Sequence, residues 1–175
     1  VNAKSFEPMS IESAEITKIA LNSYTTLKIS FSNMIMKISD KVKNANPYQI
    51  CKALGQDKRI SPYYFRPGLP FSGPCFPRDN QAFNFFQKKI GIKNFITNAT
   101  INTNKSHIQH LNNKIYKKIK LNKYKKILVL GLSFKNTTSV TEESYSIKLI
   151  DFLLKKKLKV NIYEKNINKN NSEIK

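Results

Sequence analysis

Cys75 stands in a segment whose residue types suit nucleophilic chemistry. The segment, FSGPCFPRD, places the cysteine between two prolines, with Arg78 three residues and Asp79 four residues further on. A cysteine attacks as its thiolate, which positive charge or the N-terminus of a helix stabilises. Arg78 and a helix after the cysteine would supply both, and Asp79 could act as a base for water. The alternative is that Cys75 is a small buried apolar residue.

Two further pairs are weaker candidates on spacing alone. Lys18 and Asn22 are four residues apart, so on a helix they share one face and could meet a developing anion. Two exposed polar side chains are the alternative for that pair. Phe134 and Lys135 follow an apolar strand directly, at the end of a parallel strand where ligands of α/β proteins bind.

The remaining histidines and cysteine predict no additional site. His107 and His110 have no cysteine or carboxylate nearby in the sequence, so we expect no metal centre. Cys51 lies on the apolar face of a predicted helix and is expected to be buried. The motif G-x-G-x-x-G, typical of dinucleotide binding, does not occur in the sequence.

A long helix is predicted to carry Lys18 and Asn22. It runs from Ser10, a suitable N-cap, to about Lys43, without proline or glycine. Its apolar residues recur at close to the helical period: Ile16, Ile19, Leu27, Phe31, Met34, Ile35, Ile38 and Val42. Such an apolar face exceeds what one small neighbour would cover, so we expect the helix to span a domain or to form a dimer.

The segment around Cys75 is predicted to be a long loop between helices. A short helix covers Pro47–Leu54 and ends at Gly55, and residues 55–79 contain five prolines and three glycines. This composition predicts an ordered loop that carries function. Two more helices are predicted, at Asn80–Lys89 and from Asn98 to about Lys120.

The pattern changes to α/β after residue 122. Ile127–Phe134 is a continuous apolar run of the buried parallel-strand type, Ser144–Lys157 has helical periodicity, and KVNIYEK is a second strand. Two strands do not make a stable sheet alone. We therefore predict a mainly α domain over residues 1–122, followed by the truncated start of an α/β Rossmann-like domain over residues 123–175.

The composition favours a cytoplasmic protein. The net charge is +20, and residues 80–141 contain twelve lysines and no acidic residue. A basic nucleic-acid-binding module is one interpretation, but lysine supplies nearly all of the charge and compositional bias explains it more simply. No apolar run is long enough to cross a membrane, and two cysteines form no disulfide framework. The start without methionine suggests a chain cut from a longer one.

Three segments in the same order resemble the UDP-glucose/GDP-mannose dehydrogenase family, and most closely its members that act on UDP-glucose. They are SAEITKIALNSY, DKRISPYYFRPGLPFSGPCFPRDNQAF and ILVLGLSFKNTTSVTEESYSIKLIDFLL. The resemblance implies a central helical dimerisation domain and the beginning of a C-terminal domain that binds UDP. It also implies that NAD is bound mainly by an N-terminal domain missing from this chain, so that the chain alone is inactive. A dead, dimerising remnant of the enzyme is the alternative.

The resemblance also implies roles for individual residues in oxidising UDP-glucose to UDP-glucuronate with two NAD. Cys75 corresponds to the nucleophile that forms a thiohemiacetal and then a thioester. Lys18 corresponds to the lysine that stabilises the oxyanion and Asn22 to its partner, and Asp79 corresponds to the aspartate that assists water and proton transfer. Arg78 stands where the family usually has a lysine near the cofactor, and Arg59 corresponds to an arginine that reaches the substrate of a neighbouring subunit. The remaining substrate-binding positions are Tyr64, Phe65, Arg66, Gly68, Phe71, Phe134 and Lys135.

Four of the positions that depart from the family's usual pattern bear on the substrate and cofactor sites. Pro70, Ser72 and Pro74 replace residues that are usually glycine, glycine and serine. Because proline fixes φ and lacks an N–H, the loop is expected to differ locally from that of its relatives. Glu142 stands where the family usually has an arginine that helps to bind NAD, which reverses the charge.

Overall fold

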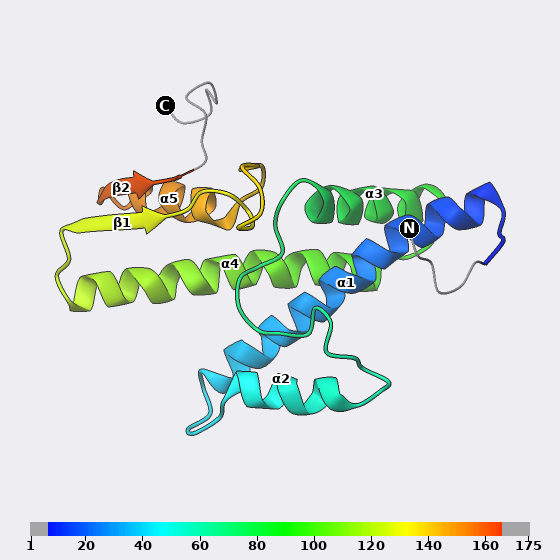
Figure 1. Cartoon of the computed structure of the whole chain (residues 1–175), viewed down its shortest axis with the longest axis horizontal. Coiled ribbons are helices and arrows are strands. Elements are labelled where there is room, and N and C mark those ends of the chain that lie inside the picture. The colour runs from blue at the N-terminus through cyan, green and yellow to red at the C-terminus, as the bar shows by residue number, and fades with distance from the viewer. Residues whose placement is uncertain (1–6, 166–175) are drawn as a thin grey trace.

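The computed structural model describes residues 7–165, which form five helices and a two-stranded sheet (Figure 1). In chain order the elements are α1 (Ile11–Ser39), α2 (Pro47–Gln56), α3 (Cys75–Lys89), α4 (Phe95–Leu121), β1 (Lys126–Leu130), α5 (Tyr145–Lys155) and β2 (Lys159–Tyr163). The predicted class, mainly helical followed by a small α/β unit, is confirmed. The division at residue 122 remains a prediction, although α4 ends beside it.

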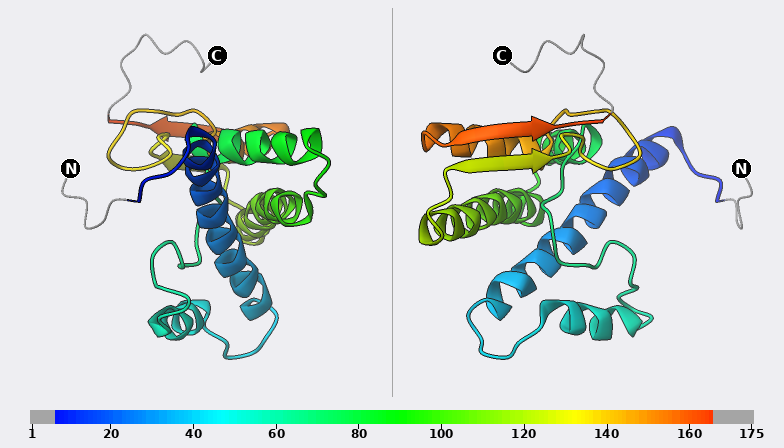
Figure 2. Two further views of the ribbon diagram at one scale, coloured as in Figure 1. Left: turned by 90° about the vertical axis from the view of Figure 1, so that its right-hand side faces the viewer. Right: turned by 60° about the vertical axis from the view of Figure 1, so that its left-hand side comes forward.

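Helix α1 crosses α3 and α4 and supports α2 on its other side (Figures 1 and 2). Ser10 is its N-cap, as predicted, and the Ser10 Oγ accepts a hydrogen bond of 3.2 Å from the Ser13 N–H. The helix ends at Ser39, four residues before the predicted end at Lys43. Its predicted apolar stripe is largely exposed, and the face that packs inward is polar: Thr25, Thr26, Ser30, Ser32, Asn33 and Ser39 are buried.

Two helix boundaries around the long loop differ from prediction. Helix α2 continues through Gly55 to Gln56, so this glycine does not end it, and Asp57 is the C-cap. Helix α3 begins at Cys75, five residues before the predicted start, with Pro77 inside its first turn. A proline is tolerated there because the first N–H groups of a helix have no partner within the helix. The loop between the two helices therefore covers residues 57–74.

Helix α4 joins the helical part to the α/β part. It begins at Phe95, three residues before the predicted start at Asn98. Near its C-terminal half, the Tyr145 hydroxyl donates a 3.0 Å hydrogen bond to the Asn112 Oδ1, and burial raises the pKa of Tyr145 to about 12. The rings of Tyr116 and Phe152 pack edge to face. These contacts fix α5 against α4.

Strands β1 and β2 are parallel, with Lys126 paired to Lys159, and α5 is the crossover between them. Both strands are shorter than predicted, and β1 stops before Gly131, whose φ is +86°. The prediction that β1 is covered on both faces is wrong for the described residues, because Leu128 and Leu130 are exposed. The buried apolar side chains of this unit are instead Leu132, Tyr145, Ile150 and Leu153. The polar segment that follows, residues 166–175, lies outside the described residues.

None of the helices in residues 7–165 combines the length and the apolar character that crossing a membrane requires.

Candidate active site

Cys75 is the first residue of α3, and its side chain is exposed. Pro74, the N-cap, provides no side-chain hydrogen bond to the helix end. The backbone N–H groups of the first turn therefore point toward the space in front of the helix, where the helix dipole favours negative charge. Cys75 thus lies at the N-terminus of a helix, as the sequence predicts.

Asp79 lies one helical turn beyond Cys75 and is the centre of a polar cluster. Its Oδ2 atom accepts hydrogen bonds of 2.6 Å from the Lys18 Nζ and 2.6 Å from the Asn22 Nδ2 of α1. Its Oδ1 atom accepts a 3.2 Å hydrogen bond from the Arg78 Nε. The structure thus brings together four predicted site residues from two distant parts of the sequence, Lys18 and Asn22 in α1 and Arg78 and Asp79 in α3.

The charges around Asp79 decide its protonation state. Burial of Asp79, which is 4% exposed, acts to raise the pKa of its carboxyl group. Hydrogen bonds from Lys18, Asn22 and Arg78 outweigh this, so the pKa of Asp79 lies below its usual value. The hydrogen bond between Arg78 and Asp79 also raises the pKa of Arg78, and the negative charge of Glu142 raises it further. Asp79 is therefore an ionised carboxylate at neutral pH.

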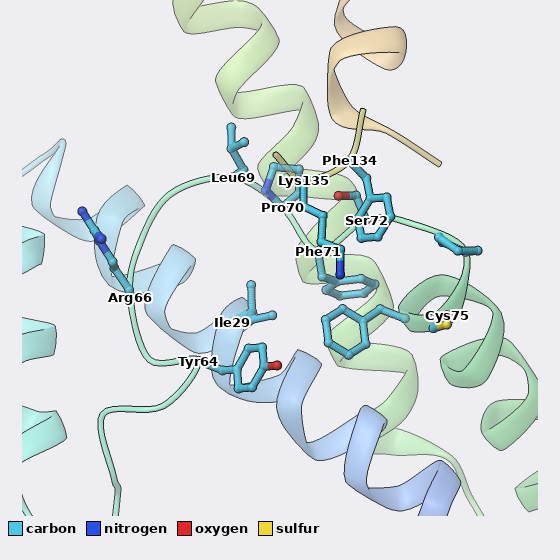
Figure 3. Close-up of a pocket in the computed structure, with 12 residues that line it drawn as sticks. Ile29, Tyr64, Arg66, Leu69, Pro70, Phe71, Ser72, Cys75, Phe134 and Lys135 are labelled. Carbon is cyan, nitrogen blue, oxygen red and sulfur yellow. The ribbon is translucent and has the colours of Figure 1, made fainter. Parts of the chain in front are cut away.

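Cys75 opens onto a pocket of about 530 Å³ (Figure 3). Tyr64, Phe71 and Cys75 lie at different sides of the pocket in this view, and the Tyr64 ring packs edge to face on Phe76 at 6.2 Å. The lining residues come from α1, the 57–74 loop, the start of α3 and the segment after β1: Ile29, Tyr64, Arg66, Leu69, Pro70, Phe71, Ser72, Pro74, Cys75, Phe76, Phe134 and Lys135. Six of the predicted site residues are among them, and so are three of the four unusual positions.

Gly73 connects the cysteine loop to the segment after β1, a role that the sequence did not reveal. Its φ is +80°, and a Cβ atom built at this position would lie 2.5 Å from the Phe134 ring. The Phe134 N–H is in turn bound to the Val140 carbonyl at 3.1 Å. Only glycine fits this conformation and this distance together, so Gly73 sets how closely Phe134 and Lys135 approach Cys75.

Three predicted substrate-binding residues do not line this pocket. Phe65 is buried and stacks on Phe31 at 6.0 Å, so it is a packing residue rather than a wall of the pocket. The backbone of Gly68 forms hydrogen bonds with side chains of α1 and α4. Arg59 is exposed and paired with Asp57, away from the pocket residues. Whether it reaches a neighbouring subunit stays a prediction.

Each of the two histidines has a hydrogen-bond partner, and Cys51 is buried. The His107 Nε2 lies 2.7 Å from the Gly68 carbonyl oxygen, and the His110 Nε2 lies 2.8 Å from the Asp40 Oδ2. Within residues 7–165, no three His, Cys, Asp or Glu side chains gather closely enough to hold a metal ion. Cys51 is 2% exposed, and burial raises the pKa of its thiol.

Comparison with known proteins places this geometry in a family. The sequence model of the UDP-glucose/GDP-mannose dehydrogenase family, central domain, matches residues 12–106, which contain Lys18, Asn22, Cys75 and Asp79. The chain belongs to this family. The predicted resemblance is thereby confirmed.

Relatives within the family include enzymes for two nucleotide sugars. The chain is 33% identical to UDP-glucose 6-dehydrogenase TuaD of Bacillus subtilis over 143 residues, 82% of this chain and 31% of TuaD. It is 30% identical to GDP-mannose 6-dehydrogenase of Pseudomonas putida over 159 residues, 90% of this chain and 35% of that enzyme. The chain therefore spans about a third of the length of these relatives, and identity alone does not select one nucleotide sugar.

Solved structures of the family share the fold. A UDP-glucose dehydrogenase from the hyperthermophilic archaeon Pyrobaculum islandicum aligns with a TM-score of 0.81 at 31% identity, over 88% of this chain and 35% of that chain. A GDP-mannose dehydrogenase from Pseudomonas aeruginosa aligns with a TM-score of 0.56 at 27% identity, over 90% of this chain.

Proposed function

We propose that this chain forms the substrate-oxidising centre of a nucleotide-sugar 6-dehydrogenase that converts UDP-glucose to UDP-glucuronate. One observation carries the proposal: Cys75 begins a helix at the mouth of a pocket, and the Asp79 carboxylate one turn later is held by Lys18 and Asn22. A nucleophile, a carboxylate and two donors at one helix end form the set that aldehyde oxidation through sulfur requires.

Cys75 would act after the C6 alcohol has been oxidised to the aldehyde. Its sulfur adds to the aldehyde carbon, and the carbonyl oxygen takes up the thiol's proton to give a thiohemiacetal. Oxidation of this adduct removes two electrons and gives a thioester. Water then attacks the thioester carbon, the C–S bond breaks, and the carboxylate leaves while the thiol of Cys75 is restored.

The polar cluster would assist the two steps in which charge develops. Lys18 and Asn22 can donate hydrogen bonds to an oxyanion on C6, since both side chains already donate to an anion, the Asp79 carboxylate. Asp79, ionised at neutral pH, can accept a proton from the attacking water. Tyr64, Arg66, Phe71, Phe134 and Lys135 would surround the nucleotide sugar.

NAD is the electron acceptor that the family implies. When bound, it would accept two electrons in each of the two oxidations. The Arg78 side chain, 66% exposed beside Asp79, is a cation that fits an anionic cofactor there. No G-x-G-x-x-G motif occurs in the 175 residues. We therefore place most of the cofactor site outside this chain and expect the chain alone to oxidise no UDP-glucose, as measured by NAD reduction.

Alkylation of the two cysteines tests the substrate site in the chain itself. Iodoacetamide is expected to modify the exposed Cys75 at least ~100-fold faster than Cys51, because Cys51 is buried and burial raises the pKa of its thiol. UDP-glucose should slow the modification of Cys75 and leave that of Cys51 unchanged, as followed by peptide mass spectrometry.

GDP-mannose is the matched control for this experiment. Stronger protection by UDP-glucose supports the proposed substrate, and stronger protection by GDP-mannose would transfer the proposal to that sugar. If neither nucleotide sugar protects Cys75 at millimolar concentration, the pocket is not the substrate site.

We further propose that the protein is a homodimer formed through α1. Exposed apolar side chains follow the helix, and Tyr24, Leu27 and Phe31 line an apolar groove of about 310 Å³ with Leu54, Ile60 and Phe65. Apolar surface that is concentrated on one face of a long helix favours self-association. A free catalytic thiol also fits a reducing compartment, so we infer a cytoplasmic location.

The Tyr24→Glu variant is expected to weaken this dimer at least ~10-fold, because it places a charge in the apolar groove. Sedimentation velocity over a concentration series measures the dissociation constant. Tyr24 is 58% exposed, so the monomer should still fold. Leu121→Glu is the control, since Leu121 is 73% exposed and lies outside the groove. Equal weakening in both variants would contradict an interface on α1.

A further inference from the structure

The backbone of residues 66–71 is held by four side chains that the proposed chemistry does not use. From α1, the Ser32 Oγ donates to the Arg66 carbonyl at 3.1 Å. The Asn33 amide accepts from the Gly68 N–H at 2.8 Å and donates to the Leu69 carbonyl at 3.1 Å. These contacts bind one side of the loop to the long helix.

Helix α4 holds the other side of the same loop. The Asn104 amide accepts from the Phe71 N–H and donates to the Phe71 carbonyl, both at 3.0 Å. The His107 Nε2 lies 2.7 Å from the Gly68 carbonyl oxygen. Because a carbonyl oxygen only accepts, the Nε2 must carry the hydrogen. We call Ser32, Asn33, Asn104 and His107 the loop clamp.

Burial makes these contacts costly to lose. Each of the four clamp residues is at most 7% exposed, and a buried polar group without a partner is strongly unfavourable. The loop has little other support: none of the backbone–backbone hydrogen bonds outside helices and strands in residues 7–165 involves residues 66–71. The clamp therefore provides the pairing that a helix or a sheet would otherwise provide.

The clamped residues form a wall of the pocket. Arg66, Leu69, Pro70 and Phe71 all line it (Figure 3). An irregular loop that had to become ordered on ligand binding would cost affinity for every residue fixed. Because the clamp orders the loop when the protein folds, ligand binding does not have to supply this free energy.

We propose that Asn33, Asn104 and His107, aided by Ser32, are positioning residues that hold the 66–71 loop in the conformation that binds the nucleotide sugar. They act through the loop and do not touch the reacting atoms. The inference rests on the proposed function for its ligand, whereas the order of the loop can be measured without a ligand.

His107 makes the clamp sensitive to acid. Its Nδ1 is buried and has no hydrogen-bond partner among the described residues, so a proton added there would be an unpaired buried donor. Burial lowers the pKa of His107, and the nearby charges of His110 and Lys37 lower it further. The hydrogen bond to the Gly68 carbonyl and the charge of Asp40 act to raise this pKa but do not outweigh the burial. His107 therefore has a higher pKa in the unfolded chain than in the folded one, so the unfolded chain is protonated first as the pH falls. The clamp loses stability below about pH 6.5 for this reason.

Two substitutions of His107 separate positioning from packing. Glutamine keeps a neutral N–H donor for the Gly68 carbonyl, whereas leucine fills similar space without a donor. In the His107→Leu variant, amide hydrogen exchange at Gly68 and Phe71 should accelerate at least ~10-fold while the amides of α3 stay protected. Affinity for UDP-glucose, measured by calorimetry, should fall about 10-fold. His107→Gln should stay within about twofold of the unmodified protein in both measurements.

The pH profile is a readout that packing alone would not change. Between pH 7.5 and 5.5 the affinity of the unmodified protein for UDP-glucose should fall, and the His107→Gln variant should lose this dependence. His110 and Asp40 are present in both proteins, so the difference between the profiles belongs to His107. If His107→Leu does not fold, Asn104→Ser replaces it, with the same expected exchange and affinity changes.

Unchanged loop exchange in a folded His107→Leu or Asn104→Ser variant would overturn the clamp. Faster exchange with unchanged UDP-glucose affinity would overturn its positioning role. If the unmodified protein binds no UDP-glucose, the proposed function fails, and the exchange rates alone still support or refute the clamp.

Discussion

Replacing Gly73 with alanine is expected to destabilise the protein by about 2–4 kcal/mol, the largest loss among its glycines. Two costs add at this position. The φ of +80° is unfavourable for any residue with a Cβ atom, and that atom would lie 2.5 Å from the Phe134 ring. The ring must move, and with it the segment that brings Lys135 to the pocket. UDP-glucose binding should weaken in the same variant.

Gly91→Ala is the matched control for this substitution. Gly91 has a similar φ of +75°, but a Cβ atom there has no neighbour within 4 Å. Its loss should be about 1 kcal/mol, the cost of the backbone conformation alone. Urea unfolding of both variants gives the two values. Equal losses would show that the Phe134 ring moves aside at little cost in free energy. In that case Phe134 does not fix the distance between the cysteine loop and the segment after β1.

The Cys75→Ala variant is expected to lose covalent capture of an aldehyde completely. The 6-aldehyde of UDP-glucose, labelled with ¹³C at C6, should form a thiohemiacetal with the unmodified chain, which changes the carbon from an aldehyde hydrate to a sulfur-bound centre. Because this addition transfers no electrons, it needs no NAD and can be observed in the chain alone. The ¹³C signal of the adduct should be absent from the variant.

Cys51→Ala is the control for the loss of a thiol as such. Cys51 is 2% exposed and lies in α2, so it should not react with the aldehyde, and the adduct signal should remain. An adduct that persists in Cys75→Ala, or that disappears in a folded Cys51→Ala protein, would contradict the assignment of Cys75 as the nucleophile.

Features of the fold that depend on local signals were predictable from the sequence. Ser10 caps a helix because a serine precedes a long run with helical periodicity, and the strand–helix–strand order after residue 126 follows from two apolar runs that flank an amphipathic one. The sequence predicts the start of α3 five residues too late because Pro77 is typical of a loop, although proline also fits the first turn of a helix. Gly55 likewise predicts a helix end, although α2 continues to Gln56.

The site was predictable only where residue chemistry is distinctive. Cys75, Asp79, Lys18 and Asn22 stood out through their spacing and the family resemblance, and the structure brings the last three into direct contact. The loop clamp was missed because a buried asparagine and an exposed one look alike in a sequence. The signal was present in α1, where Asn33 lies among apolar residues, but only tertiary contacts show what it binds.

The hydrogen bonds of Asp79 link its basicity to the charge on the substrate in the proposed reaction. Lys18 and Asn22 both donate to a single oxygen of this carboxylate, the Oδ2. As water adds to the thioester carbon, negative charge develops on the carbonyl oxygen, which would compete for the same two donors. A carboxylate that shares its donors in this way is more basic than before. Asp79 would thus become a stronger base in the step in which it takes the proton of the attacking water.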